Sequence, residues 1–271
     1  MAELGPIRQE LATTFACAAR SSRMLTLLLL FAVAVWAGVQ NALAGGGSFV
    51  TLPALIFSGL DARAANIAST IALFPGQVTT GWVGRSMVSG AGGLKVRTLV
   101  VLSLAGGAVG AALLLLTPSS FFARLVPWLV LFATALFTWG SFFRKSGETA
   151  TQVGPRTTGV MQFLIAIYGG YFGGGIGFLM LAALTAAGLA VRVAGATKNV
   201  LAGVMNAAAV AIFLFTPGIP WPRVAVVCVG AILGGYVGAR LLQRVDEKII
   251  RGFVVLLGLC LTVGLFLRQS P

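Results

Sequence analysis

The chain has 271 residues, of which 58% are hydrophobic and 9% are charged, and its formal net charge is +13 at pH 7. Ordinary soluble domains carry about 25% charged residues, so this composition excludes a soluble fold. The sequence has no histidine, which excludes serine–histidine and cysteine–histidine catalysis and histidine-ligated zinc or haem. We therefore expect an all-α polytopic membrane protein.

Eight apolar segments are suited to cross about 30 Å of hydrocarbon as helices, which takes about 20 residues each. In chain order, these predicted transmembrane helices cover residues 24–44, 64–84, 97–117, 121–143, 157–173, 193–216, 221–241 and 248–268. Two shorter apolar segments, 49–57 and 176–187, each follow a glycine triplet and are too short to cross alone. We expect them to be short or re-entrant helices, which lipid tolerates only where other protein covers the broken backbone.

The two halves of the chain repeat each other at a nearly constant spacing. The matching motifs begin at Gly45 and Gly173, at Gly106 and Gly234, and at Gly59 and Gly188. The first two pairs have the same separation along the chain, and the members of the third pair are one residue further apart, as a one-residue insertion would produce. Repetition of unrelated motifs at one spacing indicates a duplicated architecture.

We predict two four-helix repeats, each with one glycine-broken short helix. The predicted divisions are an N-terminal tail at 1–23, a first transmembrane repeat at 24–143, a linker loop at 144–156 and a second transmembrane repeat at 157–268. Parallel and inverted repeats both stay open, because the answer depends on whether the short helix counts as a crossing. Arg20, Arg23 and the Ala42-Leu43-Ala44 motif also fit a cleaved signal peptide, but cleavage there would cut a repeated unit.

The glycine triplets form the first candidate site. Glycine adopts positive φ readily, so three in succession can break a helix and present bare N–H groups. The positive N-terminal end of the short helix that follows favours an anion, and such breaks at matching positions are typical of secondary transporters. The alternative is that glycines only allow close helix packing, which we favour for Gly106, Gly107, Gly110, Gly234, Gly235 and Gly238. The substrate-binding candidates are Gly45, Gly46, Gly47, Ser48, Gly173, Gly174 and Gly175.

Lys198 is the most informative charged residue because it lies inside the sixth predicted span. Burying a lysine there costs about 2.5 to 3.5 kcal/mol on insertion scales, so an intramembrane lysine indicates a function. The alternative is a side chain that extends to the membrane interface from near a helix end. Nearby polar residues could supply further donors, although each alone is common at helix contacts. These candidates are Asn66, Ser69, Thr70 and Asn199, and Asn206 could add another donor.

All six acidic residues fall in predicted tails or loops: Glu3, Glu10, Asp61, Glu148, Asp246 and Glu247. A carboxylate proton relay inside the membrane is therefore not expected, and a positive interior without carboxylates favours an anionic substrate. The 19 lysines and arginines lie between apolar segments rather than on one face, so we interpret them as topology residues and expect no nucleic-acid partner. The three cysteines lack metal-binding spacing, and we expect no metal and no cofactor.

Five segments carry a resemblance to a known family. They are Ala44–Ser48, Leu52–Leu55 and Ala64–Thr70 in the first copy, and Phe172–Gly175 and Ala194–Asn199 in the second. In these segments the chain resembles the TauE/SafE family of sulfite exporters and related membrane transporter proteins, over about residues 24–268. The resemblance implies a multi-pass permease of the plasma (inner) membrane for small sulfur-containing or organic anions such as sulfite or sulfoacetate. Pro53 has no counterpart in the second copy. This difference argues against equal roles for the two short helices.

We interpret the chain as a secondary transporter that binds a small anion between two repeats, in contact with the lipid bilayer. An anion channel with the same lining is the alternative, and it would show conductance without saturation or counter-flow. A membrane-embedded enzyme or redox carrier is a remote alternative, because the residues for such chemistry are missing. Homo-oligomer formation stays open.

Overall fold

The computed structural model describes residues 4–43, 46–138, 153–241 and 247–269, and the regular elements in these ranges are helices. The prediction of an all-α protein is confirmed. The elements in chain order are α1 (Leu4–Leu43), α2 (Ser48–Phe57), α3 (Ala62–Gly84), the 3-10 turn η1 (Arg85–Met87), α4 (Val96–Leu116), α5 (Ser119–Thr138), α6 (Pro155–Tyr171), α7 (Ile176–Ala186), α8 (Val191–Phe213), α9 (Trp221–Leu241) and α10 (Glu247–Gln269).

Three of the described helices are long and apolar enough to cross a membrane by length and composition. They are Ser21–Asn41 within α1, α4 and α8, with mean hydropathies of 1.9, 2.5 and 1.4. Large apolar side chains such as Val101 and Leu116 face outward on α4, as lipid-facing residues do. The other predicted spans correspond to α3, α5, α6, α9 and α10, and their crossing stays a prediction.

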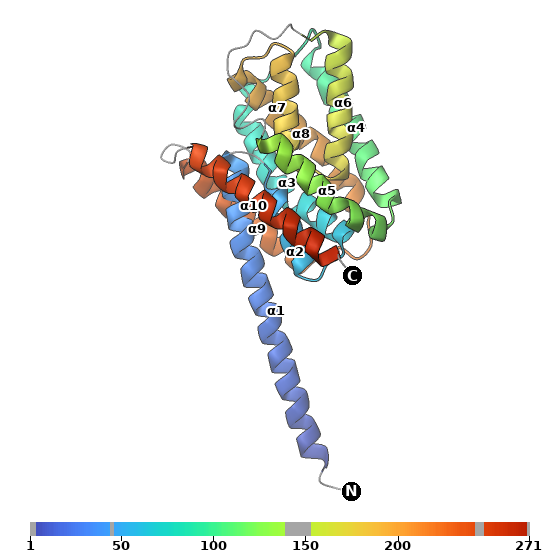
Figure 1. Ribbon diagram of the computed structural model, residues 1–271, viewed down its shortest axis with the longest axis vertical. Helices are drawn as coiled ribbons and strands as arrows, with labels where there is room; N and C mark the ends of the chain where they lie inside the picture. Colours follow the sequence, from blue (N-terminus) through green and yellow to red (C-terminus); the bar gives the residue numbers. More distant parts are fainter. Residues whose placement is uncertain (1–3, 44–45, 139–152, 242–246, 270–271) are drawn as a thin grey trace.

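Helix α1 extends well beyond the bundle, as Figure 1 shows. It has 40 residues, which at 1.5 Å per residue makes a helix of about 60 Å, roughly twice the hydrocarbon thickness. Residues 4–23, expected as a tail, are the N-terminal part of the same helix as the first predicted span. The C-terminal part of α1 packs against α9 within the bundle.

The two short helices end in the same way. Gly59 after α2 and Gly188 after α7 both have φ of +94°. The next residue in each case bonds back to the helix, from Leu60 N to Leu55 O at 3.2 Å and from Leu189 N to Leu184 O at 3.1 Å. Positive-φ glycine with such bonds is a common helix C-cap, so corresponding glycines have the same local role in both halves.

Helices from the two halves are interleaved through small residues. Helix α1 packs on α9, and α6 packs on α4. A Cβ atom added to Gly106 would lie 2.6 Å from Ala166 Cβ, and one added to Gly110 would overlap the Ile167 carbonyl on α6. A Cβ atom added to Gly234 on α9 would overlap the Val35 carbonyl on α1. The packing role predicted for these glycines is therefore confirmed at Gly106, Gly110 and Gly234.

Helices α2 and α7 point in opposite directions along the bundle. The end of α7 is joined to the loop before α4, because Gly92 N donates to Ala187 O at 3.0 Å. The residues after α2 are joined to the far end of α4, where the Arg63 guanidinium donates to the carbonyls of Leu115 and Thr117 at 3.2 and 3.1 Å. Helix α4 has 21 residues and spans about 30 Å. The C-terminal ends of the two short helices therefore lie on opposite sides of the bundle, and Figure 1 shows α7 above α2.

The long helices α3 and α8, one from each half, pack against each other. Asn206 on α8 donates a side-chain hydrogen bond to the Gln77 amide oxygen on α3. The two positions are 129 residues apart, the spacing that relates Gly59 to Gly188. Corresponding residues of the two halves therefore contact each other here.

Candidate functional site

The first helix break lies between α1 and α2. Gly46 has φ of +83°, which is the left-handed region that glycine adopts without steric cost. Gly47 is buried and precedes the first residue of α2, Ser48. Gly45 lies outside the described residues. The predicted break is therefore present. Its carbonyls accept the first hydrogen bonds of α2, from Phe49 N to Gly46 O at 2.9 Å and from Val50 N to Gly47 O at 3.1 Å.

The second break lies between α6 and α7 and has the same character. Gly173 and Gly175 have φ of +78° and +74°, and the buried Gly174 stands between them. Gly175 is the N-cap of α7. The matching triplets therefore produce matching breaks, each followed by a short helix.

The two breaks lie against each other. A Cβ atom added to Gly173 would stand 3.9 Å from Ser48 Oγ, and one added to Gly175 would stand 3.4 Å from Phe49 Cζ. The N-terminal ends of α2 and α7 thus meet head to head. Each end carries a partial positive charge of about half a unit, so the place where they meet favours a negative group.

Lys198 adds a full positive charge beside this meeting point. A Cβ atom added to Gly177, the second residue of α7, would lie 3.5 Å from Lys198 Nζ. The side chain is half-buried, and within the described residues its ammonium group has no hydrogen-bond acceptor or carboxylate. Asp61 is the one acidic residue whose side chain the structure describes. Its carboxylate caps α3 by accepting hydrogen bonds from Arg63 N and Ala64 N. Lys198 therefore lies beside the N-terminal end of α7, where no described carboxylate compensates its charge.

Two of the polar candidates from α3 join that helix to the elements around the breaks. Ser69 and Thr51 hydroxyls, both buried, are 2.6 Å apart and join α3 to α2. Asn66 Nδ2 donates to the Tyr171 carbonyl at 3.0 Å, which joins α3 to the end of α6. Thr70 donates to the Asn66 carbonyl at 2.9 Å, which is a bond within α3 itself. Ser69 and Asn66 therefore position the two breaks relative to each other.

Asn199 lies elsewhere. It lines a groove between α3, α8 and α9. Asn199 and Lys198 face different elements because neighbouring residues of a helix point about 100° apart. The structure thus brings together Gly46, Gly47, Ser48, Ser69, Gly173, Gly174, Gly175 and Lys198, with Asn66 and Thr70 beside them.

Two buried polar groups near the breaks were missed in the sequence. Gln40 is fully buried, and its Nε2 donates to the Gly46 carbonyl at 3.2 Å. Its Oε1 has no partner among the described residues, and the same holds for the buried hydroxyl of Tyr168. Gln40 and Tyr168 are separated by the same spacing as the two glycine triplets, so the repeat spacing was the signal that could have found them.

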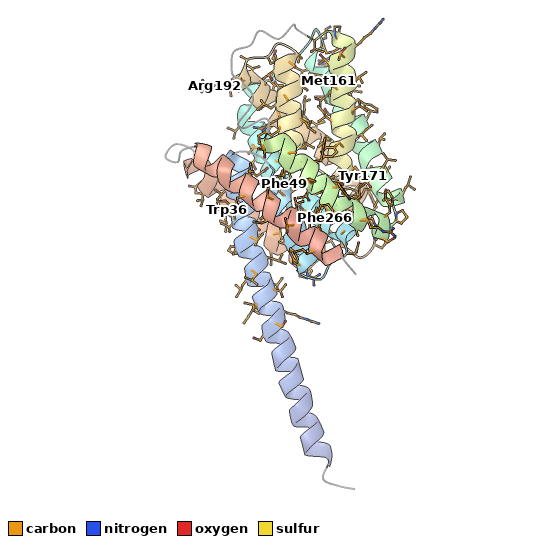
Figure 2. All side chains as sticks on the ribbon, in the orientation of Figure 1. Trp36, Phe49, Met161, Tyr171, Arg192 and Phe266 are labelled. Carbon is orange, nitrogen blue, oxygen red and sulfur yellow. The ribbon has the colours of Figure 1, made fainter. Side chains whose placement is uncertain are left out.

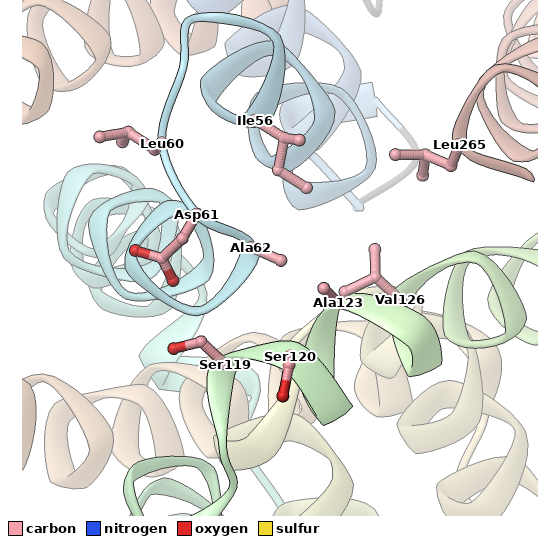
Figure 3. A pocket seen from close by; sticks show the side chains of 9 residues that line it. All are labelled: Ile56, Leu60, Asp61, Ala62, Ser119, Ser120, Ala123, Val126 and Leu265. Carbon is pink, nitrogen blue, oxygen red and sulfur yellow. The ribbon is translucent and has the colours of Figure 1, made fainter. Parts of the chain in front are cut away.

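A separate cavity of about 370 Å³ lies at the C-terminal end of α2 (Figure 3). It is lined by Ile56, Leu60, Asp61, Ala62, Ser119, Ser120, Ala123, Val126 and Leu265. The candidate residues at the breaks are not part of its lining. This cavity therefore lies apart from the meeting point of the short helices.

We expect the Ser69→Ala substitution to lower the stability of the fold by about 1 kcal/mol, because it removes a buried hydrogen bond. The measurement is a double-mutant cycle with Thr51→Val in thermal unfolding of the detergent-purified protein. A coupling of about 1 kcal/mol between the two sites supports the contact. Simple additivity of the two substitutions would contradict it.

Comparison with known proteins gives a consistent match. The family model described as "Sulfite exporter TauE/SafE" matches residues 30–265. The chain is 30% identical over 244 residues to "Probable membrane transporter protein ORF9" of Sinorhizobium sp, covering 88% of this chain and 92% of that protein. It is 27% identical to a "Probable membrane transporter protein" of Haemophilus influenzae, with coverages of 90% and 96%. It is 28% identical to the Escherichia coli K12 protein YfcA, which has the same description, with coverages of 89% and 90%.

Proposed function

Because the chain belongs to the sulfite exporter TauE/SafE family of membrane transporters, we propose that it is a secondary transporter of small anions. The observation that carries this proposal is the position of Lys198. An uncompensated ammonium group beside the positive end of α7 is electrostatically unfavourable without a negative partner. An anion bound at the meeting point of α2 and α7 would supply that partner.

The substrate class we propose is small sulfur-containing or organic anions, such as sulfite and sulfonates. The name of the matching family supports sulfite, whereas the names of the relatives state only membrane transport. Backbone N–H groups at two helix starts suit the several oxygens of such anions.

We further propose that the chain is a multi-pass protein of the plasma membrane built from two inverted repeats, with α2 and α7 as half-helices. The opposite directions of α2 and α7 support inversion, and so does the contact between Gln77 and Asn206, which occupy corresponding positions. Inverted repeats with broken helices meeting at the midplane suit alternating access, in which one repeat rocks against the other around a central site.

The test is flux into proteoliposomes that contain the purified protein and are preloaded with unlabelled sulfite. We expect uptake of radiolabelled sulfite that saturates with concentration, is stimulated by internal sulfite and responds to an imposed membrane potential. Protein-free liposomes are the control. Flux that rises linearly without counter-flow would identify a channel, and absence of both sulfite and sulfoacetate flux would contradict the proposed substrate class.

A further inference from the structure

A groove of about 540 Å³ lies between α3, α8 and α9, away from the helix breaks. Most of its wall is apolar, with residues such as Val83, Met87 and Ile232 that are also exposed on the outer face of the bundle. The polar lining residues are few and include Thr79, Asn199 and Arg192. Its size and mostly apolar wall are those of a small-molecule or lipid site.

The groove exists because one residue differs between the halves. Met205 on α8 is fully buried, and its side chain fills the space against Gly107 and Gly169. The corresponding position on α3 is Gly76, which directly precedes Gln77 just as Met205 directly precedes Asn206. No atom of a neighbouring described element lies within 4 Å of where a Cβ atom of Gly76 would stand, and the same holds for Gly235 on α9. The space that the Met205 side chain fills in the second half is therefore empty beside Gly76 in the first half.

Positive charge lies at one end of the groove. Arg192 is the second residue of α8, a helix long and apolar enough to span the membrane, so its guanidinium lies at the level of the lipid headgroups. Figure 2 places Arg192 at the end of the bundle away from the protruding part of α1. Arg85, between the lining residues Gly84 and Met87, is exposed and stacks on the Trp82 ring at 3.8 Å.

The carboxylate of Asp61 is remote from these arginines. Asp61 precedes the first residue of α3, whereas Gly84 is the last residue of that 23-residue helix, so about 33 Å separate the two ends. Among the described side chains, Arg192 therefore has no carboxylate partner, which leaves its positive charge to an external anionic group. A free anion would leave the apolar wall of the groove exposed, whereas a phospholipid would cover that wall with its acyl chain.

We propose that an anionic phospholipid binds in this groove, with an acyl chain between α3 and α9 and its phosphate on Arg192. Basic pockets between membrane helices bind anionic headgroups in this way. Arg85 adds attraction for the same headgroup at the mouth of the groove. The site is distinct from the meeting point of α2 and α7, so its occupation does not depend on the transported anion.

The test is native mass spectrometry of the detergent-purified protein titrated with phosphatidylglycerol or phosphatidylcholine. We expect the wild type to retain phosphatidylglycerol at least tenfold better than phosphatidylcholine. Gly76→Met introduces the side chain of Met205 at the corresponding position and is expected to remove one bound lipid. Arg192→Gln is expected to bring the ratio of phosphatidylglycerol to phosphatidylcholine retention close to one. Arg223→Gln, at the first turn of α9, is the matched control and should keep the preference.

Unchanged lipid retention in both Gly76→Met and Arg192→Gln would overturn the proposal. Arg192 is exposed, so its substitution tests the site even if Gly76→Met fails to fold. Inorganic phosphate at millimolar concentration should not displace the lipid. Displacement by phosphate would show a simple anion site instead, and would also contradict the proposal.

Discussion

Replacing Lys198 with methionine is expected to abolish saturable anion flux and at the same time to raise the thermal stability of the protein. Methionine keeps the length of the side chain and removes its charge. Loss of one partner of a buried charge pair costs about 2 to 5 kcal/mol, so we expect kcat/KM to fall about a hundredfold or more. Stability should rise because an uncompensated cation inside the bundle is costly in the absence of an anion.

The paired measurement is proteoliposome flux together with the midpoint of thermal unfolding in detergent without substrate. Lys198→Arg keeps the charge and should retain a measurable part of the flux. Lys95→Met is the control, because Lys95 is exposed before α4 and should affect neither quantity. Unchanged flux in Lys198→Met would show that the ammonium does not attract the anion. Lost flux with lowered stability would indicate a structural role.

Gly107→Ala is expected to destabilise the fold by about 3 kcal/mol, whereas Gly235→Ala should be neutral or stabilising. The two glycines are the second residues of the matching motifs that begin at Gly106 and Gly234, and they occupy corresponding places on α4 and α9. A Cβ atom added to Gly107 would overlap the Met205 carbonyl, which cannot move without shifting α8. Overpacking of this kind costs about 1 to 3 kcal/mol or more. Gly235 has open space, and alanine there gains up to about 1 kcal/mol of helix propensity.

The measurement compares thermal unfolding midpoints of the two variants with the wild type in the same detergent. Both variants replace a glycine by alanine at corresponding positions. A difference between their unfolding midpoints therefore reports the different packing around the two glycines. Similar midpoints for Gly107→Ala and Gly235→Ala would contradict the different packing of α4 and α9.

Helix positions could be predicted from the sequence because apolar segments of fixed length are dictated by the bilayer. The short helices expected at 49–57 and 176–187 are found at Ser48–Phe57 and Ile176–Ala186. Both breaks were predictable because glycine triplets at one repeat spacing have few other uses. The predictions of eight crossings and two repeats depend on a membrane boundary, which helix bounds alone do not test.

Side-chain placement could not be predicted because it depends on helix rotation. Lys198 and Asn199 are neighbours in sequence, yet Lys198 faces the break on α7 and Asn199 faces the groove beside α9. The groove itself depends on a comparison of Gly76 with Met205, two positions without a shared motif. Gln40 was missed because it belongs to no motif, and its repeat spacing to Tyr168 was the signal that could have marked it.

The hydrogen bond between Asn206 and Gln77 has a direction, since Asn206 donates and the Gln77 oxygen accepts. If the proposed inverted repeats are related by a two-fold axis at this contact, the bond is not symmetric, because exchange of the halves would reverse donor and acceptor. Unequal side-chain lengths at the two positions add to this difference. If the halves exchange shapes during a transport cycle, the inward-facing and outward-facing conformations therefore differ in energy at this contact, which contributes to a preference for one side.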